Sequence, residues 1–324
     1  MTTTTHVCRI AGVLLLINLI IGCSTPGQTL KLRTSALDIP AQHEIESTPF
    51  FPQLDYYCGP ATLASMVNFH DQAGEPDDIA KLIYLPELKG SLQEEMIAAT
   101  RQFNLLPVLL DGRLDSIFHE IASGNPVLVL QNLGFDTLPS WHYAIAVGYD
   151  LKSETIVLRS GTYRRLTRPF SLFERTWQRA GNWALVIAPP GDIPMTVSAD
   201  RYIDTLIDFE QTSDAQPAHA AYLSAAQKWP SNLLAHIGVG NTAYTLGDFV
   251  TSEAAYRKAL AIAPEQDQLW NNLAYALAQQ GKLGASMGSI HRAIKLAPSN
   301  DNYRQTAAEL AYWPLPAGLN TDHQ

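Results

Sequence analysis

Hydrophobic and polar residues follow three different patterns along the chain. Residues 10–21 form an apolar stretch that is broken only by Gly12 and Asn18. Helix-like and strand-like patterns mix over residues 41–190, and the strand-like patterns stop beyond Tyr202. The patterns predict an N-terminal segment with a separate role, then a mixed domain, then a helical domain.

The mixed region contains amphipathic segments first and short β-branched or aromatic runs afterwards. The expected helices cover residues 61–70, 77–85 and 91–103, and the expected strands cover residues 127–130, 142–149, 155–158 and 183–187. Helices followed by strands, without regular alternation, favour an α+β domain with an antiparallel sheet over residues 41–190. The Pro- and Gly-rich segment that begins at Pro189 then predicts a linker, assigned to residues 191–200.

The C-terminal region contains an internal repeat. Pro230, Pro264 and Pro298 are spaced 34 residues apart, and small, aromatic and small residues recur before each of them. This period resembles the tetratricopeptide repeat and predicts an all-α array over residues 201–312, followed by a tail over 313–324. The first repeat is degenerate, as terminal repeats often are. The array either binds a protein partner or only stabilises the neighbouring domain.

The N-terminal apolar stretch is too short for the ~20 residues that span a bilayer. It ends in Gly22-Cys23, which resembles the lipobox of bacterial lipoproteins. The resemblance implies a signal peptide over residues 1–22, a lipid on Cys23 that attaches the protein to a membrane, and a polar tether over residues 23–40. Ser24 favours the outer membrane of the bacterial envelope, facing the periplasm. An ordinary signal peptide or a short anchor is the alternative.

Composition and charge exclude one class of partner, and the positions of the cysteines leave one free thiol. Apolar residues make up 46% of the chain and charged residues 16%, and the net charge is −9 without a basic run, so nucleic acid is not an expected partner. Of the three cysteines, Cys8 lies in the signal and Cys23 at the anchor. Cys58 is then the only free thiol, and it is either buried and inert or kept for its reactivity.

The segment around Cys58 has features of a nucleophile. Cys58 precedes an apolar-periodic helix with Pro60 in its first turn. The positive end of the helix dipole and the free backbone N–H groups favour the thiolate there. Gln53, five residues upstream, is a candidate donor to an oxyanion.

A cysteine nucleophile needs a base, and His142 is the best of the nine histidines. Six others lie in the signal, the tether region, the repeats or the tail. His70 closes the helix that Cys58 opens, and His119 lies on a helix without a companion. His142 begins a strand after a loop, where it is either the base or a satisfied histidine at a strand edge.

These segments together resemble the double-glycine, or bacteriocin-processing, cysteine peptidases, which have a papain-like fold. The resemblance covers about residues 45–190 and rests on Gln53…Cys58-Gly59-Pro60-Ala61, on residues 124–130 and on Trp141-His142-Tyr143…Gly148-Tyr149-Asp150. It implies Cys58 as nucleophile, His142 as general base and then acid, and Gln53 as oxyanion donor. The reaction would be acyl transfer to the thiolate followed by hydrolysis of a thioester.

The third member of the triad departs from this family. An Asp or Asn is expected about sixteen residues after the histidine, and residues 155–162 contain no carboxylate. Ser160 is the candidate in its place, and it would stabilise the imidazolium less than Asp. Asp150 and Asp136 are the other possible partners of the ring.

The chain contains neither the nucleotide-binding loop nor the later membrane spans of a peptide exporter, and no motif implies a metal or a cofactor. The preferred hypothesis is an exported, lipid-anchored cysteine peptidase whose repeats recruit a protein substrate or partner. A non-enzymatic envelope adaptor with a degenerate peptidase domain is the main alternative. A transpeptidase or amidase, in which an amine resolves the thioester, is a third hypothesis.

Overall fold

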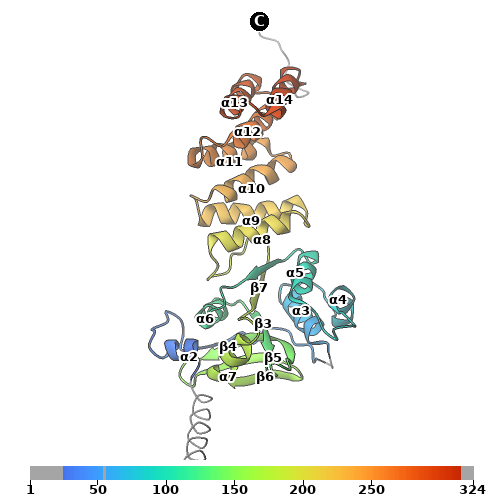
Figure 1. Cartoon of the computed structure of the whole chain (residues 1–324), viewed down its shortest axis with the longest axis vertical. Coiled ribbons are helices and arrows are strands. Elements are labelled where there is room, and N and C mark those ends of the chain that lie inside the picture. Colours follow the sequence, from blue (N-terminus) through green and yellow to red (C-terminus); the bar gives the residue numbers. More distant parts are fainter. Residues whose placement is uncertain (1–24, 54–55, 315–324) are drawn as a thin grey trace, which may run out of the picture.

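The computed structural model describes residues 25–53 and 56–314, which form a mixed domain and a stack of helices that rises from one edge of it (Figure 1). The expected fold class, an α+β domain followed by an all-α repeat array, is confirmed. The expected signal peptide, Cys8, Cys23 and residues 315–324 lie outside the described residues. No helix within the described ranges is both long and apolar enough to cross a membrane.

A seven-stranded antiparallel sheet organises the first domain. Its order is β2-β7-β3-β4-β5-β6, and β1 pairs with β4 beside this path. The strands are β1 (Gln42–Glu44), β2 (Leu106–Leu109), β3 (Val127–Asn132), β4 (Trp141–Asp150), β5 (Thr155–Ser160), β6 (Tyr163–Pro169) and β7 (Ala184–Ala188).

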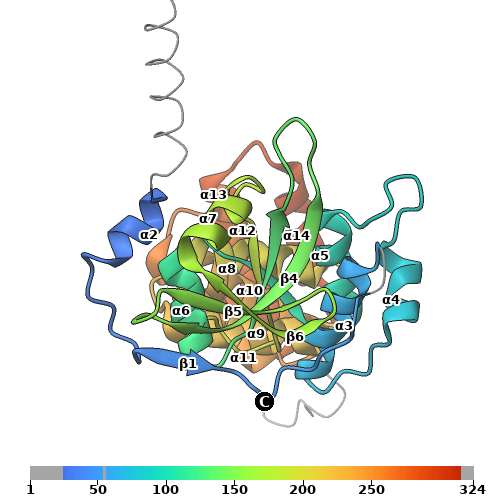
Figure 2. The same cartoon turned by 90° about the horizontal axis from the view of Figure 1, so that it is seen from below.

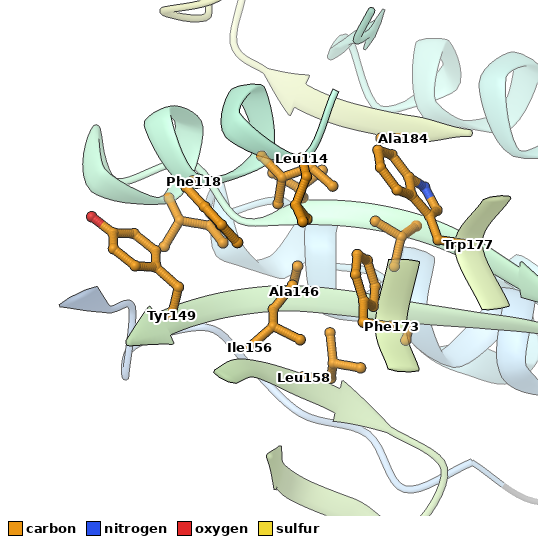
Figure 3. Packing of buried hydrophobic residues seen from close by; sticks show 14 of the residues in the cluster. Leu114, Phe118, Ala146, Tyr149, Ile156, Leu158, Phe173, Trp177 and Ala184 are labelled. Carbon is orange, nitrogen blue, oxygen red and sulfur yellow. The ribbon is translucent and has the colours of Figure 1, made fainter. Parts of the chain in front are cut away.

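Helices cover both faces of this sheet. They are α2 (Gly27–Leu32), α3 (Cys58–Phe69), α4 (Pro76–Ile83), α5 (Gln93–Gln102), α6 (Leu114–Ala122) and α7 (Phe170–Gln178). Ala144 and Ala146 of β4 belong to the core beneath α6 and α7, where Phe118 and Trp177 are fully buried (Figure 3). Ile145 belongs to the opposite core, against α3 and α5. Because both faces are covered, the central strands are almost continuously apolar.

The second part consists of paired antiparallel helices with the expected period. The helices are α8 (Ala199–Glu210), α9 (Ala215–Lys228), α10 (Leu233–Thr245), α11 (Phe249–Ile262), α12 (Asp267–Gln279), α13 (Leu283–Leu296) and α14 (Asp301–Ala311). Glycines in α10 allow the close packing that the repeat requires. A Cβ on Gly238 would lie 2.3 Å from the ring of Tyr222, and one on Gly240 would lie 2.5 Å from the ring of Tyr256.

The repeats share a core with the sheet. Leu106 and Val108 of the edge strand β2 pack in one cluster with Tyr202 and Leu206 of α8. The expected linker is held in place as well, since the buried carboxylate of Glu120 accepts hydrogen bonds from the backbone N–H groups of residues 195 and 196 at 3.1 and 2.6 Å. The linker is therefore a fixed joint between the two parts.

The segment expected to be a tether also differs from the prediction. Its helix α2 packs on the first domain, and the buried carboxylate of Glu174 accepts the backbone N–H groups of Gln28 and Thr29 at 2.8 and 2.6 Å. The carboxylate therefore satisfies free donors at the start of α2. The polar pattern of residues 23–40 does not reveal this order, because the residue that holds α2 lies about 145 positions away in the sequence.

Candidate active site

Cys58 is the first residue of α3, a twelve-residue helix in which residues 59–67 are buried. The backbone N–H groups of Tyr143, Gly59 and Cys58 itself stabilise a thiolate and lower the pKa of the thiol, but burial raises it more. The pKa of Cys58 therefore lies above its ordinary value. The expectation of a stabilised thiolate is not met at rest, because desolvation outweighs the helix N-terminus.

His142 is the second residue of β4 and lies opposite Gln131 of β3. Its Nε2 lies 2.8 Å from Oγ of Ser160, the last residue of β5. When Nε2 carries the proton, Ser160 accepts it in a hydrogen bond, and Nδ1 keeps a free lone pair. Burial lowers the pKa of His142, so the ring is neutral near pH 7. The resting pair is thus a thiol and a neutral imidazole.

The structure decides among the candidate partners of the ring. Asp150 lies at the far end of β4, eight residues from His142, which is about 27 Å at about 3.4 Å per residue. Its carboxylate accepts the backbone N–H of Lys152 in a turn. Asp136 is exposed in the β3–β4 loop. Among the three candidates, Ser160 alone has a hydrogen bond with the imidazole.

Gln53 is held by the turn that follows Ser160. The backbone N–H of Gln53 donates to the carbonyl of Gly161, and the N–H of Gly161 donates to Oε1 of Gln53, both at 3.0 Å. Because Oε1 is occupied, the amide nitrogen is the end of the side chain left for a ligand. Gly161 has a φ of +59°, which favours glycine at this turn. One turn therefore positions both Gln53 and Ser160.

Gln53, Cys58 and His142 line one open cleft of about 950 Å³. The residues of two loops form its walls, namely the α4–α5 loop before Gln93 and the β3–β4 loop before Trp141. Within the described ranges, no group of three or more His, Cys, Asp or Glu side chains is arranged to hold a metal ion. The cleft has the groups for nucleophilic attack, proton transfer and oxyanion binding at a carbonyl.

Sequence reasoning expected the backbone N–H groups at the start of α3 but missed the one that β4 contributes. The N–H of Tyr143 faces the thiol, and the phenol of Tyr143 donates to the carbonyl of Ser91 at 3.2 Å. The side chain of Ser91 packs against the start of α3, where Gly59 leaves room for it. A backbone donor can come from any residue type, so no sequence pattern marks it.

Substitution of Gly59 by alanine is expected to displace the wall of the cleft. The added Cβ would lie 2.6 Å from Oγ and 2.8 Å from Cβ of Ser91. We expect Gly59→Ala to lower the free energy of unfolding by about 1–3 kcal/mol, measured by urea denaturation. The double variant Gly59→Ala/Ser91→Gly should recover most of this loss. If the double variant is as unstable as Gly59→Ala, the contact with Ser91 is not the cause.

Comparisons with known proteins agree with this architecture. Residues 45–185 match the Peptidase_C39 like family, and residues 267–300 match the tetratricopeptide repeat. Residues 45–185 therefore form a C39-like domain by this family match. Tetratricopeptide repeats follow it, as the sequence predicted.

Similar solved structures cover the two parts separately. A putative C39-like peptidase from Bacillus anthracis is 16% identical, covers 45% of this chain and 97% of its own, and has a TM-score of 0.39. The first tetratricopeptide-repeat domain of Spaghetti (RPAP3), bound to an HSP90 peptide, is 15% identical and covers 35% of this chain and 90% of its own, with a TM-score of 0.34. A search of curated proteins found no match.

Proposed function

We propose that the protein is a cysteine peptidase. The observation that carries the proposal is that Cys58, His142 and Gln53 line one cleft while Ser160 hydrogen-bonds the far side of the imidazole. This arrangement leaves Nδ1 of His142 as the nitrogen available to a proton from the thiol.

The reaction follows from these groups. Nδ1 of His142 takes the proton of Cys58 as the sulfur attacks the carbonyl carbon of a peptide bond. The amide of Gln53 and the backbone N–H of Cys58 stabilise the tetrahedral oxyanion, and each such donor contributes about 10²–10³ in rate. The imidazolium then gives its proton to the leaving amine, which leaves a thioester on Cys58. A water deprotonated by His142 hydrolyses the thioester and releases the carboxylic acid.

We further propose that the repeats bind a protein partner or deliver the substrate. The family match supports a protein-interaction role for these repeats. A groove of about 420 Å³ crosses α10, α11 and α12, and its lining contains no charged side chain. The groove is lined by Asn241, Tyr244, Thr245, Tyr256, Asn272 and Tyr275. Neutral amide and phenol groups suit the backbone of an extended peptide.

A place in the bacterial envelope, with a lipid on Cys23 and the protein on the periplasmic side of the outer membrane, remains part of this proposal. It rests on the sequence around Cys23. If the proposal holds, only a few residues separate the membrane from α2. Cys23→Ser should then release the protein from isolated membranes.

The alternative function is a non-enzymatic adaptor, and one observation favours it. Ser160 stands where the family has a carboxylate or an amide, and a hydroxyl stabilises an imidazolium less. In this case the repeats carry the function, and Cys58 is a partly buried thiol without a role.

Labelling by an electrophilic peptide probe across pH separates the two functions. An active Cys58 should react with a peptidyl vinyl sulfone, and the rate should fall only below the ordinary histidine pKa of about 6.5, because burial lowers the pKa of His142. The base is neutral, and so competent, above its pKa and is lost as pH falls through it. Labelling is measured as the second-order rate constant by intact-protein mass spectrometry.

His142→Ala should abolish the labelling near neutral pH, where the Cys58 thiol is protonated. The exposed histidine of α13 provides the control, and His291→Ala should react like the unaltered protein. Equal labelling rates for the unaltered protein and His142→Ala at every pH would remove the peptidase proposal and leave the adaptor.

A further inference from the structure

The cleft beside Cys58 is bordered by apolar side chains that have no partner in the described structure. Leu88 and Leu92 on the α4–α5 loop are 60% and 44% exposed, and Trp141 at the start of β4 is 55% exposed. Leu130 and Ala180 contribute further apolar surface to the lining. Large exposed apolar side chains that gather at one cleft mark a binding surface.

Two further exposed apolar residues lie at the tip of the β3–β4 loop, where Phe135 and Leu138 are 76% and 75% exposed. Figure 2 shows this loop and the α4–α5 loop projecting on the same side of the molecule. Together with the cleft wall they form what we call the apolar rim. The apolar rim consists of Leu88, Leu92, Phe135, Leu138 and Trp141.

The loop that carries Phe135 and Leu138 is a hydrogen-bonded hairpin, and its geometry keeps both side chains exposed. The backbones of these two residues exchange hydrogen bonds of 3.1 Å, and Oδ1 of Asn132 accepts the N–H groups of Gly134 and Ser140 at 3.0 and 2.9 Å. A Cβ on Gly134 would lie 2.4 Å from the carbonyl oxygen of Leu138. The fold therefore holds both side chains outward.

Charge in the cleft is sparse and of one sign. Lys89 is the one charged residue among those that line the described cleft. Its Nζ lies 5.5 Å from the centre of the ring of Tyr56, which also lines the cleft. This ammonium repels a basic side chain and attracts an acidic one.

We infer that the cleft binds an extended polypeptide segment with bulky apolar side chains next to the scissile bond, and with an acidic rather than a basic residue near Lys89. This inference rests on the proposed function and names its substrate class. It departs from the double-glycine sequence that the resemblance would suggest, because glycines would leave the apolar rim uncovered. An apolar side chain that covers the rim strengthens binding about tenfold or more.

Peptide binding to the Cys58→Ala variant tests the inference without turnover. Fluorescent peptides of one length would carry Phe-Leu, Gly-Gly or Lys-Lys at the centre, and the Kd of each is measured by anisotropy. We expect the Phe-Leu peptide to bind at least tenfold more tightly than the Gly-Gly peptide, and the Lys-Lys peptide to bind weakest. A Phe-Leu peptide extended by Glu should bind more tightly than one extended by Lys.

Variants of the apolar rim test whether its side chains cause the preference for the Phe-Leu peptide. Phe135→Ser/Leu138→Ser, made in the Cys58→Ala background, should reduce the Phe-Leu over Gly-Gly ratio about tenfold. Leu172→Ser removes a leucine of α7 that is 47% exposed and lies outside the cleft, and it should leave the ratio unchanged.

Three results would overturn the inference: equal Kd values for all peptides, a preference for Gly-Gly, and binding of neutral phospholipid vesicles in place of peptides. The last result would make the apolar rim a membrane contact. Probe labelling of Cys58 tests the proposed function separately, so apolar selectivity without labelling would remove the peptidase and keep the binding site.

Discussion

Hydrolysis of a fluorescently labelled unfolded protein is expected to fall at least about a thousandfold in His142→Ala, to the level of Cys58→Ala. Burial raises the pKa of the Cys58 thiol, so the sulfur is protonated at neutral pH and needs a base as it attacks. His142 is neutral at that pH because burial lowers its pKa. The rate is measured as the initial release of fluorescent peptides.

The double variant decides whether the two residues act as one unit. Cys58→Ala/His142→Ala should be no slower than either single variant, since both residues serve the same proton transfer. His291→Ala should retain the full rate. If His142→Ala stays within about tenfold of the unaltered protein while Cys58→Ala is inactive, another group is the base.

The protonation of His142 depends on the burial of its ring, because the partner of the imidazole is Ser160 and not a carboxylate. A hydroxyl orients the imidazole but adds no charge to hold its proton. The lowered pKa of His142 has desolvation as its cause, without a carboxylate to oppose it. An imidazole that stays neutral to below pH 6.5 is the consequence of its burial without a neighbouring carboxylate.

The sequence predicted the elements whose pattern is local. The apolar periodicity after Cys58 and the β-branched runs before and after His142 gave the central helix and strands within a few residues of their ends. The proline spacing gave the repeats. These patterns depend only on neighbours along the chain, so one sequence is enough to see them.

The parts that were missed depend on distant partners. β6 has exposed residues at most positions and three arginines, so its pattern does not resemble a strand, yet it pairs with β5 along its length. The order of α2 comes from Glu174, and the pKa of Cys58 is set by burial under elements that a single sequence does not bring together. Contacts between residues far apart in the sequence therefore explain both the order of α2 and the protonated resting state of the Cys58 thiol.

Removal of the repeats is expected to unfold the peptidase domain as well. A chain that ends after residue 190 would expose Leu106 and Val108 on the edge strand β2. It would also lose the apolar side chains of α8 that cover them. Burial of a large apolar side chain contributes about 1.5–3 kcal/mol, so several at this joint together approach the ~5–15 kcal/mol that stabilises a whole domain. The exposed edge would also pair with other chains and aggregate. Circular dichroism and light scattering of the truncated chain measure both effects.

A single substitution in the complete chain tests the contact between α8 and β2 without removal of the other repeats. Leu206 of α8 is fully buried in the core shared with β2, whereas the next residue, Ile207, is 39% exposed. Leu206→Ala should lower the free energy of unfolding by about 2–5 kcal/mol, and Ile207→Ala by much less. A chain that ends after residue 264 keeps α8 to α11 and should retain a folded peptidase domain. If the chain that ends after residue 190 folds as stably as this longer one, the repeats are an independent domain and the joint carries no stability. A fixed joint otherwise means that anything bound by the repeats is held at a set position relative to the Cys58 cleft.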